Sequence, residues 1–183
     1  MEYNPSIYIA SSSNICRYAL GVEGNNPLIV IGVNPSTADD KIPDRTMTKV
    51  MNHARILGFD GFIMFNLYPQ RATCPDDLQE KPNMKFIEKN TEVIKLVFRK
   101  YAGKTILAAW GQTIMMRPYL IDCLKEIQDI LSPFEPKWGH LGTLTLNGHP
   151  RHPSRTSYAC RLIEFNIHRY IKKLSIGSLS ELN

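Results

Sequence analysis

Short apolar runs alternate with segments of helical periodicity along this chain, and that alternation restricts its fold more than any other feature. The runs are LIVIGV (28–33), FIMFNL (62–67), TILAAW (105–110) and, more weakly, LGTLTL (141–146). Continuous apolar strands are typical of a parallel sheet that helices cover on both faces. IYIA (7–10) has the pattern of an additional edge strand.

Between and after these runs, apolar side chains recur three and four residues apart, as they do on the buried face of a helix. The stripes are Met47, Val50, Met51, Ala54 and Leu57; Ile87, Ile94, Val97 and Tyr101; Leu120, Leu124, Ile127 and Leu131; and Leu162, Ile163, Tyr170 and Leu174. Strands that alternate with helices predict an α/β fold. We expect a three-layer α/β/α sandwich around a central, mostly parallel four-stranded sheet, with right-handed crossovers.

Length and composition fit one globular domain that spans residues 1–183. The chain is 43% hydrophobic and 21% charged, and it contains no internal repeat or long linker. Its 22 Lys and Arg residues against 17 Asp and Glu residues give a net charge of +5. That charge permits an anionic partner, such as nucleic acid, without requiring one.

The cysteine pattern and the hydropathy bear on cofactors and location. Cys16, Cys74, Cys123 and Cys160 lie far apart with no CxxC pair, so we expect neither zinc nor an iron–sulfur cluster. We predict no other metal and no cofactor. No signal peptide is visible at the N-terminus. No apolar run approaches the roughly 18 residues that a membrane span needs. The sequence therefore predicts a cytoplasmic protein without a membrane partner, and it leaves the oligomeric state open.

Polar segments follow each of the four main predicted strands. They are NPSTADD (34–40), NLYPQR (66–71), WGQ (110–112) and NGHPRHPSR (147–155). In open α/β sheets, ligands bind beyond the carboxyl ends of the strands, so these segments predict a site at one edge of the sheet. Taken singly, each also has a structural explanation, because Asn-Pro-Ser is a common turn and a histidine beside proline is usually a surface residue.

Four of these segments carry a resemblance to a known superfamily. GVNPS, FNLYPQRATCPDDL, AAWG and HPSR resemble, in order and spacing, the signature segments of the uracil-DNA glycosylase superfamily. Over roughly residues 7 to 170, the chain is most similar to the domain-of-unknown-function family numbered sixteen forty-three, through NPSTADD, DRT, RAT and AWG. The resemblance implies a uracil-DNA glycosylase-like fold and hydrolysis of the N-glycosidic bond of uracil or a modified base. DNA or a nucleotide would then be the partner, with no cofactor.

The resemblance also implies particular roles for residues on the strand ends. His152 would donate a hydrogen bond to the oxygen where negative charge develops on the departing base. Asn34 would hold the attacking water, although an amide cannot accept a proton as a carboxylate does. Asn66 would read the pairing edge of the base.

Further residues would surround the base or contact phosphates. The base-contacting group is Gly32, Pro35, Ser36, Tyr68 and Trp110, and the DNA-contacting group is Arg71, Arg151, Ser154 and Arg155, with Ser36 also near phosphate. Tyr68 takes its place because residues 36–47 lack the aromatic that members of the superfamily usually carry there. Arg155 and its neighbours stand where those members often have an apolar wedge.

Two groups of charged residues keep alternative interpretations at this stage. Asp39, Asp40 and Asp44 could form a solvated loop, assist a metal, or recognise a cationic substituent on a base, and Asp44 could cap the helix that starts near Arg45. Arg71 could be a strut paired with Asp39 or Asp44, or could point at a phosphate.

The sequence leaves two alternative functions beside the glycosidic hydrolase. One is a non-catalytic nucleic-acid or nucleotide binder on the same fold. The other is a different enzyme of modified-nucleotide metabolism.

Overall fold

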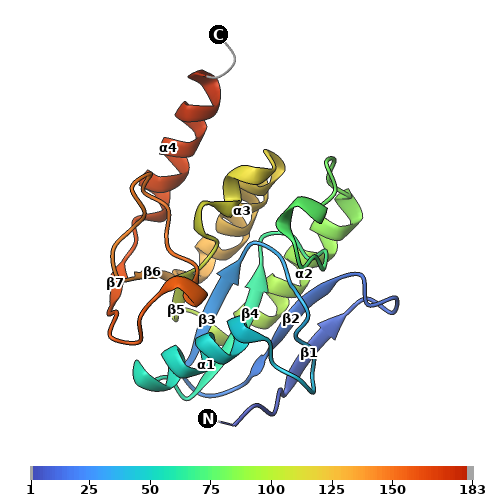
Figure 1. Cartoon of the computed structure of the whole chain (residues 1–183), viewed down its shortest axis with the longest axis vertical. Coiled ribbons are helices and arrows are strands. Elements are labelled where there is room, and N and C mark those ends of the chain that lie inside the picture. Colours follow the sequence, from blue (N-terminus) through green and yellow to red (C-terminus); the bar gives the residue numbers. More distant parts are fainter. Residues whose placement is uncertain (1, 181–183) are drawn as a thin grey trace.

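The computed structural model describes residues 2–180 and is built around one mixed sheet of seven strands (Figure 1). The strands are β1 (Ile7–Ala10), β2 (Arg17–Val22), β3 (Pro27–Gly32), β4 (Gly61–Asn66), β5 (Thr105–Ala108), β6 (Lys137–Leu141) and β7 (Leu162–Glu164). Their order across the sheet is β1-β2-β4-β3-β5-β6-β7. The α/β class is therefore confirmed, but the sheet is larger than the four strands expected.

The four middle strands, β4, β3, β5 and β6, pair in parallel, whereas β1, β2 and β7 pair antiparallel at the two sides. The expected edge strand at 7–10 is confirmed as β1. The fourth apolar run was placed wrongly, because the strand is Lys137–Leu141 rather than 141–146. Gly142 has a φ of +62°, which turns the chain out of the strand directly after Leu141.

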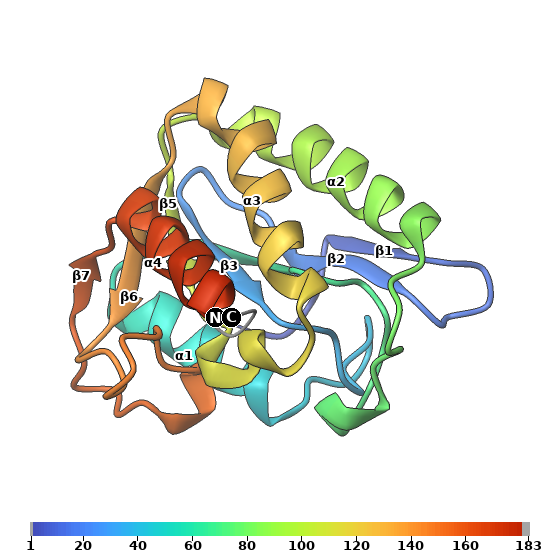
Figure 2. The same ribbon diagram turned by 90° about the horizontal axis from the view of Figure 1, so that it is seen from above.

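Four helices cover the sheet: α1 (Arg45–Ile56), α2 (Met84–Phe98), α3 (Tyr119–Leu131) and α4 (Ile167–Ser180). Figure 2 shows α2, α3 and α4 on one face and α1 on the other. Alternate residues of β3 explain both layers, because Leu28 and Val30 pack in the cluster of α1 while Ile29 and Ile31 pack in the cluster of the other three helices. The helical stripe proposed from residue 162 starts too early, since Leu162–Glu164 is strand β7.

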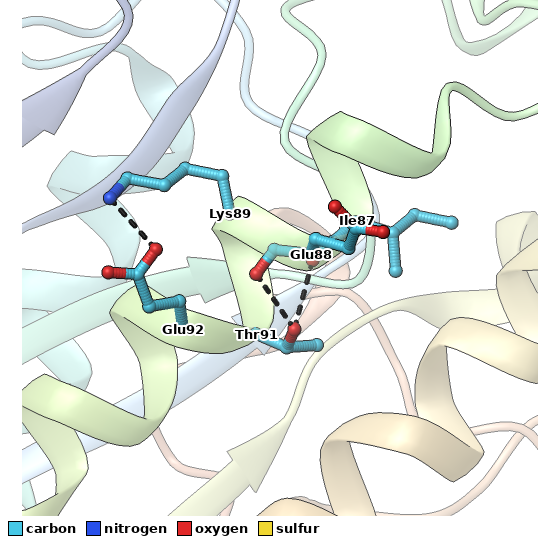
Figure 3. A network of polar contacts seen from close by, with 5 residues as sticks. All are labelled: Ile87, Glu88, Lys89, Thr91 and Glu92. Carbon is cyan, nitrogen blue, oxygen red and sulfur yellow. Dashed lines mark hydrogen bonds and ion pairs between the residues drawn. The ribbon is translucent and has the colours of Figure 1, made fainter.

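Capping residues decide where these helices start, and the burial of their apolar faces decides where they lie on the sheet. Asp44 caps α1, its Oδ1 accepting from the Met47 N–H at 2.8 Å, which confirms the capping prediction. Within α2, the Thr91 hydroxyl donates to main-chain carbonyls of the preceding turn, and Lys89 pairs with Glu92 at 2.9 Å (Figure 3). Such an exposed ion pair contributes at most about 1 kcal/mol, so the buried face of α2 decides where it lies.

The register of the parallel strands brings the polar segments together. Gly32, the last residue of β3, lies beside Asn66, the last residue of β4, and Ile31 lies beside Ala108 of β5. The segments that leave these strands therefore start at the same edge of the sheet. Over residues 2–180, none of the helices is both long and apolar enough to cross a membrane.

Candidate functional site

A cavity of about 490 Å³ opens at the carboxyl ends of the parallel strands. It lies where the segments after β3, β5 and β6 meet the start of α1. The predicted site residues that line it are Gly32, Asn34, Ser36, Trp110, Arg151, His152, Ser154 and Arg155. Those that do not line it are Pro35, Asn66, Tyr68 and Arg71. The expected convergence of the polar segments at one edge is thus present in the fold.

His152 is held in a defined neutral form. Its Nδ1 accepts a hydrogen bond from the Ser154 N–H at 3.2 Å and lies 2.7 Å from the Ser154 hydroxyl oxygen. Burial lowers the pKa of His152, the positive charge of Arg155 lowers it further, and Asp44 acts in the opposite direction. A neutral ring that accepts at Nδ1 carries its proton at Nε2, so His152 presents one N–H donor.

Ser154 positions His152 rather than offering a free hydroxyl. Its oxygen lies against Nδ1 of His152, which has no proton to give in this tautomer, so the hydroxyl donates to the ring. The Ser154 proton is therefore not available to a phosphate. Ser154 was predicted as a phosphate contact, and the geometry gives it a positioning task instead.

Asn66 is fully buried directly beneath the cavity floor. Neither its Nδ2 nor its Oδ1 has a hydrogen-bond partner in the described chain, although its main-chain carbonyl accepts from Asn90. A methyl group at Gly32 would lie 3.0 Å from Oδ1 of Asn66 and 2.6 Å from Cε of Met64. Gly32 and Met64 both line the cavity. Because position 32 has no side chain, the Asn66 amide lies close behind the cavity wall.

Asn34 is half-buried, and its side-chain amide is hydrogen-bonded through the nitrogen but not through the oxygen. Its Nδ2 donates to the carbonyls of Pro35 at 3.0 Å and Ala72 at 2.8 Å. No hydrogen bond engages its Oδ1 within residues 2–180. Pro35 is buried and does not line the cavity. Its carbonyl also accepts from the Ala72 N–H at 2.9 Å and so holds this turn, and its contact with a base stays a prediction.

The two aromatic residues predicted to contact a base belong to the core. Tyr68 is fully buried outside the cavity lining, and its hydroxyl bonds Gln79 and the Asn83 N–H. Its proposed stacking task is therefore wrong; residues 67–70 turn away from the end of β4, so the alternation assumed for a continued strand does not hold. Trp110 lines the cavity, but its indole is fully buried and donates to Tyr170 at 3.0 Å, which leaves no donor for a ligand.

Arg71 is a strut for the segment after β3. Its Nη1 donates to the carbonyls of Ser36 at 2.7 Å and Ala38 at 3.0 Å, and its Nη2 donates to the Tyr8 hydroxyl at 2.8 Å. The partners are main-chain carbonyls and a hydroxyl, not the carboxylates of Asp39 or Asp44. This guanidinium is committed to the loop and does not line the cavity, and the predicted phosphate contact at Arg71 stays a prediction.

The other predicted cations lie on the rim. Arg151 donates from Nε to the carbonyl of Thr143 at 2.9 Å and keeps its terminal nitrogens for other partners. Arg155 is exposed and lines the cavity, and its guanidinium makes no hydrogen bond or ion pair within the described chain. Their contact with phosphate stays a prediction.

The acidic residues near the cavity have structural tasks. Asp39 accepts from the Lys41 and Ile42 N–H groups, both at 2.8 Å, which lowers the pKa of its carboxyl. Asp44 caps α1, and Asp40 is exposed. Between residues 2 and 180, no three His, Cys, Asp or Glu side chains are grouped so that they could hold a metal ion. Asp39, Asp40 and Asp44 therefore do not form a metal-binding cluster.

Arg17, at the start of β2, lines the cavity and was missed from the sequence. It is only 1% exposed, and its Nη1 donates to the carbonyl of Ala38 at 2.8 Å. An arginine inside the short apolar stretch CRYALGV was the available signal, because charged residues are rarely buried without a reason. Thr46, in the first turn of α1, also lines the cavity and was not anticipated.

The fold and the site together define an α/β protein with a cation-rich cavity at the carboxyl ends of its parallel strands. The family model described as "Protein of unknown function (DUF1643)" matches residues 17–154, which is more than half of the chain. The chain belongs to that family. No curated protein and no solved structure matches the chain.

Proposed function

We propose that this protein hydrolyses the N-glycosidic bond of a nucleobase, in DNA or in a nucleotide. The observation that carries the proposal is the amide of Asn66, which is fully buried below the cavity with neither polar atom bonded. Leaving a buried amide unpaired costs about 1–3 kcal/mol. A pyrimidine such as uracil supplies both an acceptor and a donor on its pairing edge, which would satisfy this amide.

Two further groups suit the chemistry. In the hydrolysis, the oxygen of water bonds to the anomeric carbon, and the base leaves with the electron pair of the broken bond and takes up a proton. The Nε2–H of neutral His152 is a fixed donor for the negative charge on the departing base. The free Oδ1 of Asn34 can accept a hydrogen bond from the attacking water and so orient it.

Asn34 also sets a limit on the rate. An amide cannot take the proton from water, so the factor of about 10²–10⁴ that a general base supplies would be absent. We therefore expect a slow enzyme. The resemblance of GVNPS, RAT and HPSR to the uracil-DNA glycosylase superfamily supports the class of reaction, by analogy of motifs rather than by geometry.

The test is a base-release assay on two kinds of substrate. Single- and double-stranded oligonucleotides that carry uracil, deaminated purines or modified pyrimidines would be assayed for alkali-labile sites, and nucleotides for free base. We expect base release by the native protein and a large loss of base release in His152→Ala and in Asn66→Leu. A surface variant such as Lys137→Gln should release base at the native rate. Absence of base release from every substrate would overturn the proposal.

A non-catalytic nucleotide or nucleic-acid binder is the second candidate function. It is favoured by the unpartnered guanidinium of Arg155 on the rim and by the cavity lining within residues 2–180, where Asp44 is the carboxylate and its Oδ1 caps α1 instead of activating water. Such a binder would lose affinity as salt is raised and would leave its ligand intact. Binding measured at two salt concentrations, with product analysis of the same samples, separates the two functions.

A further inference from the structure

We propose that Arg17, Ser36 and the first turn of α1 form an anion subsite inside the cavity that binds a terminal phosphate of the ligand. The subsite is the part of the cavity wall that these three elements share. Its identity as a phosphate site rests on the proposed function, because a nucleotide is the ligand that would bring the phosphate there.

The first observation is that Arg17 is buried without a counter-ion. Its side chain is 1% exposed, its single hydrogen bond goes to the carbonyl of Ala38, and its Nε has no partner. None of the ion pairs in the described chain includes it. A buried cation is costly unless it is paired, so a residue of this kind points to a partner that arrives with a ligand.

The charge of Arg17 is retained at neutral pH. Burial lowers the pKa of its guanidinium to about 10, the neighbouring Arg71 contributes in the same direction, and Asp44 opposes both. The group is therefore still a cation, with an unfavourable like-charged neighbour. A bound anion would relieve both the burial and the repulsion.

The second observation is a main-chain N–H at the start of α1 that the Asp44 cap leaves unbonded. This helix has 12 residues, and its Thr46 lines the cavity with a main-chain N–H that makes no hydrogen bond in residues 2–180. The hydroxyl of Ser36, which also lines the cavity, has no partner in the same range. Free N–H groups and the positive end of the helix dipole favour an anion there.

Asp44 is the carboxylate of the cavity lining within residues 2–180; its charge favours the Arg17 cation, but the two side chains form no ion pair. Its Oδ1 accepts from the Met47 N–H at 2.8 Å, and its Oδ2 lies 3.4 Å from the Ala38 nitrogen. Both oxygens are thus turned onto the main chain. Arg17 and Thr46 keep their free donors.

The burial of Arg17 inside the cavity favours a phosphate monoester over a phosphodiester. A phosphodiester carries a sugar on both sides, which would have to enter the cavity with it. A terminal phosphate has three free oxygens and can reach a buried guanidinium end-on, where two parallel hydrogen bonds can form. The ligand class is therefore a phosphate monoester, supplied by a free nucleoside monophosphate or by the end of a short strand.

The experiment compares ligands with and without the phosphate. Calorimetry would measure binding of uridine, uridine monophosphate, inorganic phosphate and a 5′-phosphorylated oligonucleotide to the native protein, Arg17→Met, Arg17→Lys and the control Arg99→Met. Arg99, directly after α2, is exposed and does not line the cavity, so Arg99→Met removes the same charge away from the subsite. The carbonyl of Ala38 keeps its bond from Arg71 in Arg17→Met, so we expect that variant to fold.

We expect the monophosphate to bind the native protein more tightly than uridine, and Arg17→Met to weaken the monophosphate by about tenfold or more. Uridine should bind Arg17→Met and the native protein equally. Affinity for the monophosphate should be intermediate in Arg17→Lys and unchanged in Arg99→Met. Whichever of uridine monophosphate and the 5′-phosphorylated oligonucleotide binds more tightly identifies the source of the phosphate.

Equal binding of uridine and its monophosphate to the native protein would overturn the subsite, as would a folded Arg17→Met that binds the monophosphate normally. If Arg17→Met does not fold, two other measurements test the subsite. Monophosphate affinity that is unchanged in Arg17→Lys, together with a melting temperature of the native protein that phosphate does not raise, would overturn it. Phosphate-dependent binding without any base release would refute the hydrolase and keep the subsite. Base release at the same rate in the native protein and in Arg17→Met would refute the subsite and keep the hydrolase.

Discussion

Two walls of the cavity are held in place by different chemistry. The arginine wall, residues 34–44, is fixed by guanidinium groups of Arg17 and Arg71 that donate to its main-chain carbonyls. The histidine wall, residues 147–156, is fixed on its inner side by hydrogen bonds between neutral side chains, and Lys49 and Lys173 donate to its main-chain carbonyls at Thr156 and Asn147. Figure 1 shows the two segments converging at the carboxyl ends of the parallel strands, from the start of α1 on one side and from the loop after β6 on the other.

Two networks build the histidine wall. Trp110 donates to the Tyr170 hydroxyl, whose oxygen is hydrogen-bonded with Nδ1 of His149 at 2.8 Å. The Thr156 hydroxyl donates to the carbonyl of Pro153 at 2.8 Å and therefore accepts from Nε2 of His53 at 2.9 Å. The walls differ in where their cations lie: Arg17 is buried at the arginine wall, where it suits an anion, whereas the cations of the histidine wall lie on the rim and its buried side chains are uncharged.

The largest expected effect is on catalysis, at His152. If the proposed function is right, His152→Ala removes the one fixed donor and should lower the rate of base release by about 10²–10³-fold. Ser154→Ala should cost less, since the ring stays and only its orientation is loosened. Rates measured with saturating substrate check both. Equal rates for native protein and His152→Ala would contradict the assignment.

The second prediction separates the two arginines of the arginine wall. Arg71→Met removes three hydrogen bonds and orphans the carbonyl of Ser36, so it should lower the free energy of unfolding by about 2–4 kcal/mol. Arg17→Met orphans nothing, because Ala38 retains Arg71, and should leave stability unchanged or raise it. Urea unfolding of the two variants in parallel is the measurement. Equal losses would mean that Arg17 is a second strut.

The third prediction concerns the Thr156 network of the histidine wall. Thr156→Val keeps the volume of the side chain but leaves buried His53 and the carbonyl of Pro153 without their shared partner. We expect a loss of about 1–3 kcal/mol in unfolding free energy. Thr48→Val, at an exposed position of α1, is the control and should change stability by less than about 1 kcal/mol. A stable Thr156→Val would show that this wall is held by packing alone.

The smallest expected effect is the response to acid. Burial lowers the pKa of His53, His140, His149 and His152 from the ordinary 6.5, so the unfolded chain binds more protons than the folded chain below that pH. Their contribution is present above about 6.5 and is lost as the pH falls through the folded pKa values. Thermal unfolding should therefore show a gradual fall in stability from pH 7 to pH 5. A flat profile would mean that these rings are not buried neutral.

Local signals in the sequence were sufficient for much of the fold. The apolar runs 28–33 and 62–67 are strands because both faces of the sheet are covered, and the same pattern predicts helices on each side. Asp44 could be recognised as a cap because capping depends on residues three positions apart. The run at 141–146 could not be placed correctly, since short alternating stretches fit a strand or the loop after one.

The location of the site could be predicted from the sequence, whereas the tasks of its side chains could not. The chain by itself determined that NPS, RAT, AWG and HPSR would gather at one edge, because parallel strands end on the same side of their sheet. Only the tertiary structure decided what each side chain does there. Tyr68 and Arg71 are taken into the core and the loop, whereas Arg17 enters the cavity from β2, a strand distant in sequence from every motif. Burial and hydrogen bonding depend on neighbours that only the folded chain brings together, and no spacing along the sequence contains them.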